Sequence, residues 1–250
     1  MKTILLLPLV LASSLAEPAP QELQRPPDGG MREVLVSILI PSLPNAPFSA
    51  IVNSEWIRQL ADGTTITLKN RRAIARDQAG RIFQERRLLV PDDGKHESVL
   101  TQIEISDPVA HKLFICVPQE RVCQLELFTV PKFERLPARA ASNPPGSSDV
   151  EDLGKQTIDE LETEGTRETT IIETGAIGNN RPIQVTREFW YSPQLGVNLI
   201  SKRQDPRFGI QNFEVTEIAL GNPDSKLFEL PAGSKVIDLR KASEISSPTH

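Results

Sequence analysis

The stretch 183–191, which reads Ile-Gln-Val-Thr-Arg-Glu-Phe-Trp-Tyr, carries the pattern that decides the fold. Ile183, Val185, Arg187, Phe189 and Tyr191 fall on one side of an extended chain, and Thr186, Glu188 and Trp190 fall on the other. Such a period of two is typical of a half-buried β-strand. The stretch 99–105 repeats it, with Val, Thr, Ile and Ile alternating with Leu, Gln and Glu. We therefore expect a β protein.

Turn-forming residues recur between stretches of this kind. Asp62-Gly63 separates 48–60 from 64–76, and the tetrapeptide 77–80 separates the latter from 81–90. Later corners fall at 91–94, 178–180 and 221–224, where Gly, Asn, Asp and Pro gather. Turns at this spacing predict about ten antiparallel strands in a meander.

Residues 149–164 allow two interpretations. Leu153, Ile158 and Leu161 stand among many acidic residues, and Ser148 is a possible helix cap. A strand over 157–164 is favoured, because Gly165-Thr166 and the run 169–172 would continue it as a hairpin. The apolar run 34–40 is interpreted as a strand or a short core segment.

The N-terminus has the features of a signal peptide over residues 1–16. Lys2 precedes the apolar stretch 4–11, and Ser14 and Ala16 place small residues at the cleavage site. The apolar stretch is much shorter than the ~20 residues that cross a bilayer, and no later stretch is long enough. We expect an exported protein, periplasmic or extracellular in a bacterium. No Cys follows the cleavage site, so we expect no lipid anchor.

Pro, Gly and polar residues divide the rest of the chain. We expect a flexible leader over 17–30, a single β domain over 31–240 with a disordered loop at 131–150, and a polar tail over 241–250. After loss of Lys2, 27 basic residues face 33 acidic ones, a formal net charge of −6. Nucleic-acid binding needs a concentrated basic surface, so this balance argues against that class of partner.

Cys116 and Cys123 are the two cysteines of the chain, and they flank a short polar turn. If the turn centres on Gln119-Glu120, the two residues lie directly opposite each other in a hairpin. Opposed residues of a non-hydrogen-bonded pair are about 4.5 Å apart at Cα, which a disulfide can bridge. We predict a disulfide, with a redox-active pair and two free thiols as the alternatives.

Short motifs, taken in order, resemble a group of uncharacterised secreted bacterial proteins over residues 34–237, apart from 131–150. The motifs include Pro47-Phe48-Ser49-Ala50, Asp62-Gly63, Arg76-Asp77-x-x-Gly80-Arg81, Glu188-x-Trp190-x-Ser192, Asp205-Pro206-Arg207-x-Gly209 and Pro223-Asp224-x-x-Leu227-Phe228-x-x-Pro231. The chain departs from the group at Glu160, where a glycine is expected, and in its cysteine pair.

The meander is more distantly similar to the lipoprotein-carrier superfamily. That resemblance implies a fold rather than an activity: one curved antiparallel sheet, a half-barrel around an apolar cavity for acyl chains, with at most one or two short helices.

Two groups of residues are candidates for binding. Trp56, Phe189, Trp190 and Tyr191 could form a ligand wall, although ordinary core packing is the favoured interpretation. Arg71, Arg72, Arg86 and Arg87 belong to a basic segment, 69–87, that could bind an anionic group. Pairing with the acidic segment 151–173, or a solvated face, is favoured there.

Catalytic and metal-binding patterns are missing from the sequence. It contains no nucleophile elbow, phosphate-binding loop, dinucleotide fingerprint or zinc-protease motif, and its three His residues are far apart. We expect no enzyme activity, no cofactor and no metal. The function expected first is binding of a lipid or other amphiphile in the curved sheet, and the alternative is docking of an envelope protein by a module with a packed interior.

Overall fold

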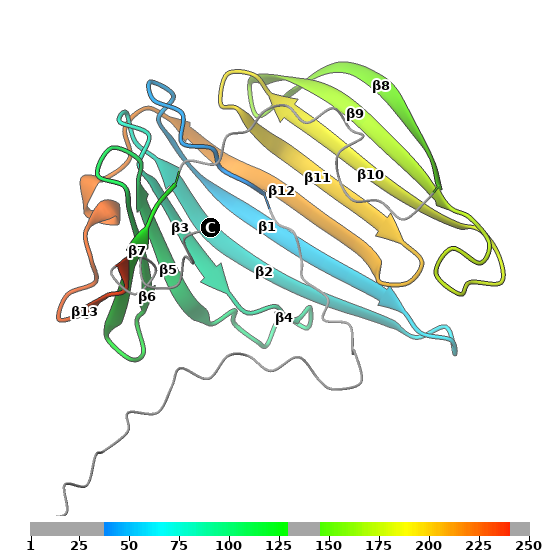
Figure 1. Cartoon of the computed structure of the whole chain (residues 1–250), viewed down its shortest axis with the longest axis horizontal. Coiled ribbons are helices and arrows are strands. Elements are labelled where there is room, and N and C mark those ends of the chain that lie inside the picture. Colours follow the sequence, from blue (N-terminus) through cyan, green and yellow to red (C-terminus); the bar gives the residue numbers. More distant parts are fainter. Residues whose placement is uncertain (1–37, 130–145, 241–250) are drawn as a thin grey trace, which may run out of the picture. The chain divides into compact units, whose positions relative to one another are not determined.

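The fold is built almost entirely of strands (Figure 1). The computed structural model describes residues 38–129 and 146–240, which belong to one compact unit, 36–250. Its elements are β1 (Phe48–Gln59), β2 (Thr65–Arg76), β3 (Ile82–Arg87), β4 (Val90–Pro91), β5 (Leu100–Asp107), β6 (Lys112–Val117), β7 (Val122–Leu127), β8 (Gly146–Ile158), β9 (Leu161–Ile172), β10 (Ile183–Ser192), β11 (Val197–Asp205), β12 (Gly209–Leu220), the 3-10 helix η1 (Ser225–Phe228) and β13 (Lys235–Asp238).

The described strands form a single sheet. Its order is β13-β7-β6-β5-β3-β2-β1-β12-β11-β10-β9-β8, and β4 pairs with β2 beside this path. Two meanders, β1 to β7 and β8 to β12, therefore join where β1 pairs with β12, in the middle of the sheet (Figure 1). β7 and β8 follow each other in the described sequence but lie toward opposite ends of the sheet.

The expected fold class is confirmed in its main features and wrong in its strand count. The described residues form one open curved sheet of 13 strands rather than about ten. The stretch 81–90 divides into β3 and the two-residue β4, and β13 pairs with β7 in parallel rather than antiparallel orientation. The pattern of half-buried alternation does not reveal β13, because all four of its residues are exposed.

The interpretation of 149–164 is corrected. These residues are neither a helix nor a strand over 157–164: β8 ends at Ile158, a turn follows at Asp159 and Glu160, and β9 begins at Leu161. Both turn residues have positive φ, 48° and 65°. That is the conformation of a type I′ hairpin turn, which favours Gly at the second position. The sequence did not predict this turn because residue 160 is a glutamate, whereas an Asp-Gly pair would have indicated a hairpin turn.

Several expected segments fall at or beyond the limits of the described residues. The signal peptide (1–16), the leader (17–30) and the tail (241–250) lie outside them. The loop expected at 131–150 is corrected at its end, because residues 146–150 belong to β8, and its remainder lies outside the described residues. In the apolar run 34–40, Ile38 and Ile40 are buried, and residues 38–40 form no strand.

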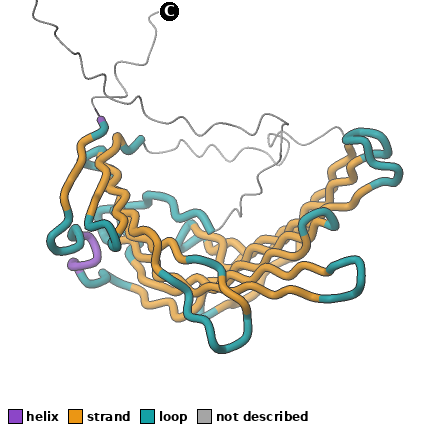
Figure 2. The backbone as a smooth tube through the Cα atoms, turned by 90° about the horizontal axis from the view of Figure 1, so that it is seen from below, coloured by secondary structure: helices purple, strands orange, loops and turns teal. Residues whose placement is uncertain are grey.

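The sheet is strongly curved, and η1 lies on its convex side (Figure 2). The convex side is called the outer face below, and the concave side is called the inner face. There Phe228 packs against Ala75, Phe83 and Ile105, which form a buried apolar cluster. Successive side chains of a strand point to opposite faces, so Ile74 and Arg76, the neighbours of Ala75, face the inner side. Both are buried. Apolar side chains are therefore buried on both faces of the sheet.

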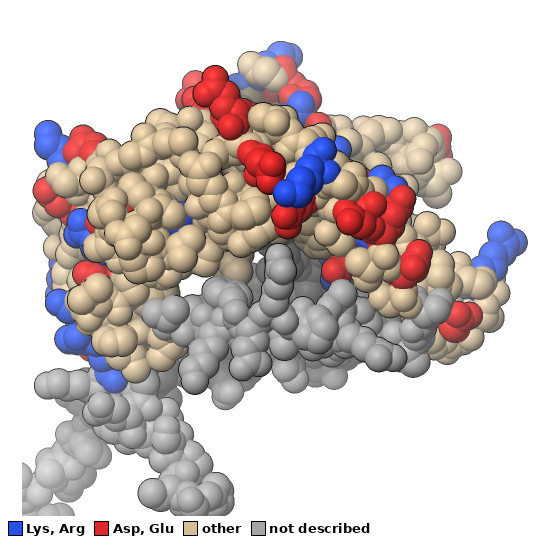
Figure 3. Space-filling view, turned by 90° about the horizontal axis from the view of Figure 1, so that it is seen from above, with Lys and Arg blue, Asp and Glu red and all other residues tan. Residues whose placement is uncertain are grey.

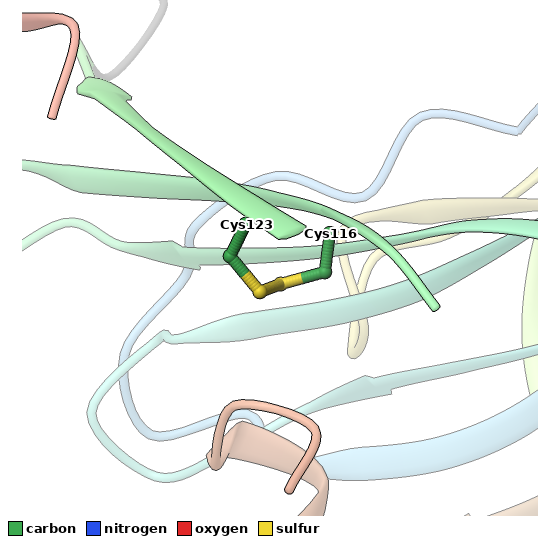
Figure 4. Close-up of a disulfide and its surroundings, with 2 residues drawn as sticks. All are labelled: Cys116 and Cys123. Carbon is green, nitrogen blue, oxygen red and sulfur yellow. A yellow bond between two sulfur atoms is a disulfide. The ribbon is translucent and has the colours of Figure 1, made fainter. Parts of the chain in front are cut away.

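The disulfide prediction is confirmed. Cys116 of β6 lies directly opposite Cys123 of β7, and the two form a disulfide with a Cα–Cα distance of 3.9 Å (Figure 4). Both residues are fully buried. The bond links neighbouring strands near the β13 end of the sheet.

Candidate functional site

A pocket of about 760 Å³ opens on the inner face of the sheet. One wall is formed by residues 38–47, which we call the crossing segment, and the other by strands β9, β10 and β11. The residues that line the pocket are Leu39, Pro41, Ser42, Leu43, Glu164, Thr166, Glu168, Phe189, Tyr191, Gly196 and Asn198. Leu39 is 58% exposed, the highest value among the large apolar residues of the pocket.

Strand register explains the composition of the sheet wall. Phe189 lies opposite Thr166, and Tyr191 lies opposite Glu164, in the antiparallel pairing of β10 with β9. Residues two apart on one strand share a face, so both aromatic rings point toward the crossing segment. An irregularity between Trp190 and Tyr191 in the pairing with β11 brings Asn198 opposite Tyr191. The wall therefore combines aromatic faces with hydroxyl, amide and carboxylate groups.

Arg76 holds the crossing segment against the sheet. Its guanidinium donates hydrogen bonds to the backbone carbonyls of Pro41 (3.0 Å) and Ala46 (2.9 Å), and to that of Leu195 (2.6 Å) beyond β10. The side chain is fully buried and its Cζ lies 5.0 Å from the centroid of the Phe48 ring. Burial lowers the pKa of Arg76 to about 10. One cation thus links the two walls of the pocket through carbonyl groups.

Gly196 allows the two walls to come close together. It has a φ of 66°, and a Cβ at this position would lie 3.3 Å from Cδ2 of Leu43 and 3.7 Å from the hydroxyl oxygen of Tyr191. Next to Leu43, the Ser42 hydroxyl donates to the carbonyl of Gly80 at 2.8 Å. The apolar side chains of the segment are therefore anchored beside the aromatic wall.

Two carboxylates face the pocket, Glu164 and Glu168. Lys155 of β8 lies 3.7 Å from Glu164 and 2.8 Å from Glu162. Within the described part of the chain, Glu168 takes part in no identified ion pair, and Arg187 lies opposite it on β10. The pocket thus offers a polar edge beside its apolar wall.

The four predicted aromatic residues divide between three places. Phe189 and Tyr191 line the pocket. Trp190 lies on the outer face, where its ring covers Gly165 and its Nε1 donates to Glu188 at 3.0 Å. Trp56 lies near the end of β1, a strand in the middle of the sheet, and donates to the carbonyl of Phe208 at 2.8 Å. The hydrogen bond from Trp190 lowers the pKa of Glu188, and Arg167 adds to the effect.

The four predicted arginines lie on both faces and do not line the pocket. Arg86 pairs with Glu104 at 2.8 Å, Arg87 pairs with Glu85 at 2.8 Å, and Arg71 pairs with Glu217. Arg72 is 3% exposed and donates to the carbonyl of Ile38 at 3.5 Å. Burial, with the positive charge of Arg86, lowers the pKa of Arg72 to about 10. Arg72 thus lies under the crossing segment, on the same face of β2 as Arg76.

The basic and acidic segments form their ion pairs with close neighbours in the sheet. The basic segment 69–87 pairs with Glu55, Asp92, Glu104 and Glu217, and with its own Asp77 and Glu85. In the acidic segment, Lys155 pairs with Glu162, and Arg167 pairs with Glu151 and Glu188. Acidic and basic side chains lie next to one another on the face shown in Figure 3. None of these ion pairs joins the basic segment to the acidic segment, which is the pairing that was expected.

Other kinds of site are not found among the described residues. No group of three or more His, Cys, Asp or Glu side chains there could hold a metal ion. Nor does any described helix have the length and apolarity needed to cross a bilayer.

The crossing segment is the part of the pocket that sequence reasoning missed. Leu39 belongs to the apolar run 34–40, and Leu43 follows it. The composition of this run indicates burial, but it does not indicate which face of the sheet the run covers. Glu164 and Thr166 would have been found from the register of β9 with β10, which requires the turn at Asp159 and Glu160 to be placed correctly.

The fold of this chain is similar to those of several solved structures, at low sequence identity. No protein-family profile matches the chain, and no curated protein matches it. An uncharacterised conserved protein from Thermus thermophilus has a TM-score of 0.38 and 10% identity, covering 78% of this chain and 91% of that one. MucB of Pseudomonas aeruginosa, in complex with MucA, has a TM-score of 0.42 and 15% identity, covering 77% and 58%.

A LolA superfamily protein from Nitrosomonas europaea is also similar, with a TM-score of 0.30 and 12% identity, covering 75% of this chain and 91% of that one. The meander of the chain, rather than its short motifs, carries the distant similarity to this lipoprotein-carrier superfamily. At such identities and TM-scores, these likenesses carry no argument about ligand or partner. The feature of this chain that bears on function is the pocket of about 760 Å³ on the inner face of the curved sheet.

Proposed function

We propose that the protein binds an apolar or amphiphilic, lipid-like molecule in the inner-face pocket, without catalysis. The observation that supports this proposal is the pocket itself, whose volume of about 760 Å³ falls in the range of small-molecule sites. Leu39, Leu43, Phe189 and Tyr191 would contact the apolar part of the ligand. Glu164, Glu168, Thr166 and Asn198 would face its polar end.

The proposal includes export to the periplasm or the exterior of a bacterium. The disulfide between Cys116 and Cys123 supports an oxidising compartment, where such bonds persist. Cleavage after Ala16 would leave Glu17 as the first residue. The intact mass of the protein recovered from its own host tests this part, and a mass that includes residues 1–16 would contradict it.

Binding is tested with N-phenyl-1-naphthylamine, an uncharged probe that fluoresces in apolar surroundings. The variant Thr166→Trp places a large ring in the pocket beside Phe189, so it should weaken probe binding about tenfold or more. Thr169→Trp is the matched control, because it makes the same exchange on the other face of β9. It should bind the probe as the unaltered protein does.

Native mass spectrometry of the protein purified from its own host gives a second measurement. A co-purified lipid that Thr166→Trp excludes and Thr169→Trp retains is the expected result. Absence of probe binding to the unaltered protein, or equal binding by both variants, would favour the alternative of an envelope docking module without a ligand.

A further inference from the structure

A second pocket, of about 570 Å³, lies where the β1–β2 and β11–β12 hairpins meet. Among its lining residues are Arg58, Gln59, Thr65, Gln204, Arg207 and Phe208. It shares no lining residue with the inner-face pocket and is independent of the function proposed above. The motif Asp205-Pro206-Arg207-x-Gly209, singled out in the sequence, forms one side of it.

Asp205 is the carboxylate of this site, and its acceptor capacity is taken up by two arginines. It is 1% exposed. It accepts hydrogen bonds from Nε and Nη2 of Arg207 at 2.9 and 2.7 Å, from the Arg207 backbone N–H at 3.0 Å, and from Nη2 of Arg203 at 2.9 Å. Two guanidinium charges therefore share one carboxylate, which leaves an excess of positive charge.

Arg58, which lines the pocket, and Arg203, which lies outside its lining, have donor groups without an identified partner among the described residues. A guanidinium has five N–H donors in a planar fork. Nε of Arg203 is buried and has no hydrogen-bond partner. Within ranges 38–129 and 146–240, Arg58 takes part in no identified ion pair; its Cζ lies 5.2 Å from the centroid of the Trp56 ring. Of these two arginines, Arg58 lines the pocket and is exposed, so its guanidinium is available to an acceptor that enters there.

Aromatic rings hold the arginines in place. Cζ of Arg203 and of Arg207 lie 5.5 and 5.0 Å from the Phe208 ring centroid, and Trp56 donates to the Phe208 carbonyl. Such cation–π contacts orient a guanidinium without neutralising its charge. The acidic residue of the β1–β2 turn, Asp62, accepts a hydrogen bond from the Thr64 N–H and does not line the pocket.

We propose that this second pocket binds a phosphate group, either free or as the headgroup of an anionic lipid. Guanidinium forks match the geometry of such oxyanions. Arg58 and Arg207 supply the charge, and the side chains of Gln59, Thr65 and Gln204 supply further donors at the pocket wall. Asp205 keeps Arg203 and Arg207 in position.

Isothermal titration with sodium phosphate at constant ionic strength tests the site in the full chain. The unaltered protein should bind phosphate, and Arg58→Gln should weaken binding about tenfold, the effect of one charge-assisted hydrogen bond. Arg58 is exposed, so this variant should melt at the temperature of the unaltered protein. Arg181→Gln, an exchange of an exposed arginine outside the pocket, is the control and should bind normally.

Vesicles distinguish the two sources of the phosphate group. Flotation with phosphatidylglycerol vesicles but not phosphatidylcholine vesicles, lost in Arg58→Gln, assigns the site to a lipid headgroup; phosphate binding without flotation assigns it to the free anion. No binding of phosphate by the unaltered protein, or equal binding by Arg58→Gln, overturns the proposal. Neither result depends on the naphthylamine probe, so failure of the inner-face function is recognised separately.

Discussion

Asp205 links the stability of the chain to pH. Burial alone would raise its pKa, but the hydrogen bonds and charge of Arg207, with the charge of Arg203, lower it below the ordinary value. A carboxylate with a lowered pKa in the folded state stabilises the fold at neutral pH. That contribution is complete above the unfolded-state pKa of about 4 and is lost as the pH falls through the lowered value.

Asp205→Asn should therefore lower the free energy of unfolding at pH 7 by about 2 kcal/mol, because it leaves two partly buried arginines without their counter-charge. The difference from the unaltered protein should shrink below pH 4. Thermal unfolding followed between pH 2 and pH 8 measures it. Asp149→Asn, at an exposed position of β8, should show no such difference. A gap that stays constant over the whole range would contradict the argument.

Single residues of the site were predictable where alternation alone decides them. Phe189 and Tyr191 share a face, and Trp190 takes the other, as the period of two requires. Sequence could not assign the partners of Arg71, Arg72, Arg86 and Arg87, because strand register decides which acid lies across from each. Arg71 pairs with Glu217, nearly 150 positions later in the chain.

At the scale of elements, the β8–β9 hairpin contains a residue that its backbone disfavours. Glu160 has a φ of 65°, and a non-glycine residue loses stability in that conformation. Glu160→Gly should raise the free energy of unfolding by about 0.5–1 kcal/mol, since Asp-Gly is a preferred type I′ pair. Urea unfolding measures the change. Glu173→Gly, which removes an exposed glutamate elsewhere, should not stabilise, and a loss of stability in Glu160→Gly would refute the prediction.

The other element limits were predictable in proportion to the strength of their turn signals. Asp62-Gly63 and the 77–80 tetrapeptide place β1 and β2 to within one residue of the expected stretches. The Cys116–Cys123 register followed from a turn centred on Gln119-Glu120. The Asp159-Glu160 turn has no such signal. For that reason the limits of β8 and β9 were not predicted correctly.

At the scale of the whole molecule, the two meanders depend on the pairing of β1 with β12. Gly209 begins β12 with a φ of 95°, and a Cβ there would lie 2.1 Å from the carbonyl oxygen of Ile57. Gly209→Ala should therefore cost more than about 2 kcal/mol of unfolding free energy, since it adds a backbone clash to the conformational strain. Hydrogen exchange should show loss of protection in both β1 and β12.

Gly63→Ala is the matched control. Gly63 has a φ of 85° with no atom within 4 Å of an added Cβ, so this exchange carries the conformational cost alone. The difference between the two variants measures the clash at Ile57. Equal destabilisation by both would show that the approach of β12 to β1 is not as close as the structure has it.

Sequence patterns predicted the single sheet but not the pairings that join distant parts of the chain. Each meander follows local turn signals, whereas the β1–β12 pairing and the parallel addition of β13 to β7 join distant segments. The crossing segment covers the inner face through hydrogen bonds from Arg76 to carbonyl groups, and carbonyl groups are the same in every sequence. No side-chain pattern marks such contacts.

The pairing of Phe48 with Leu220 spans about 170 residues. During synthesis, β1 to β7 are complete long before β12 exists, so the free edge of β1 has no partner in its own chain for most of that time. An unpaired strand edge is a template for association with other chains. The order of the strands thus sets a period of aggregation risk that ends only when β12, residues 209–220, has been made.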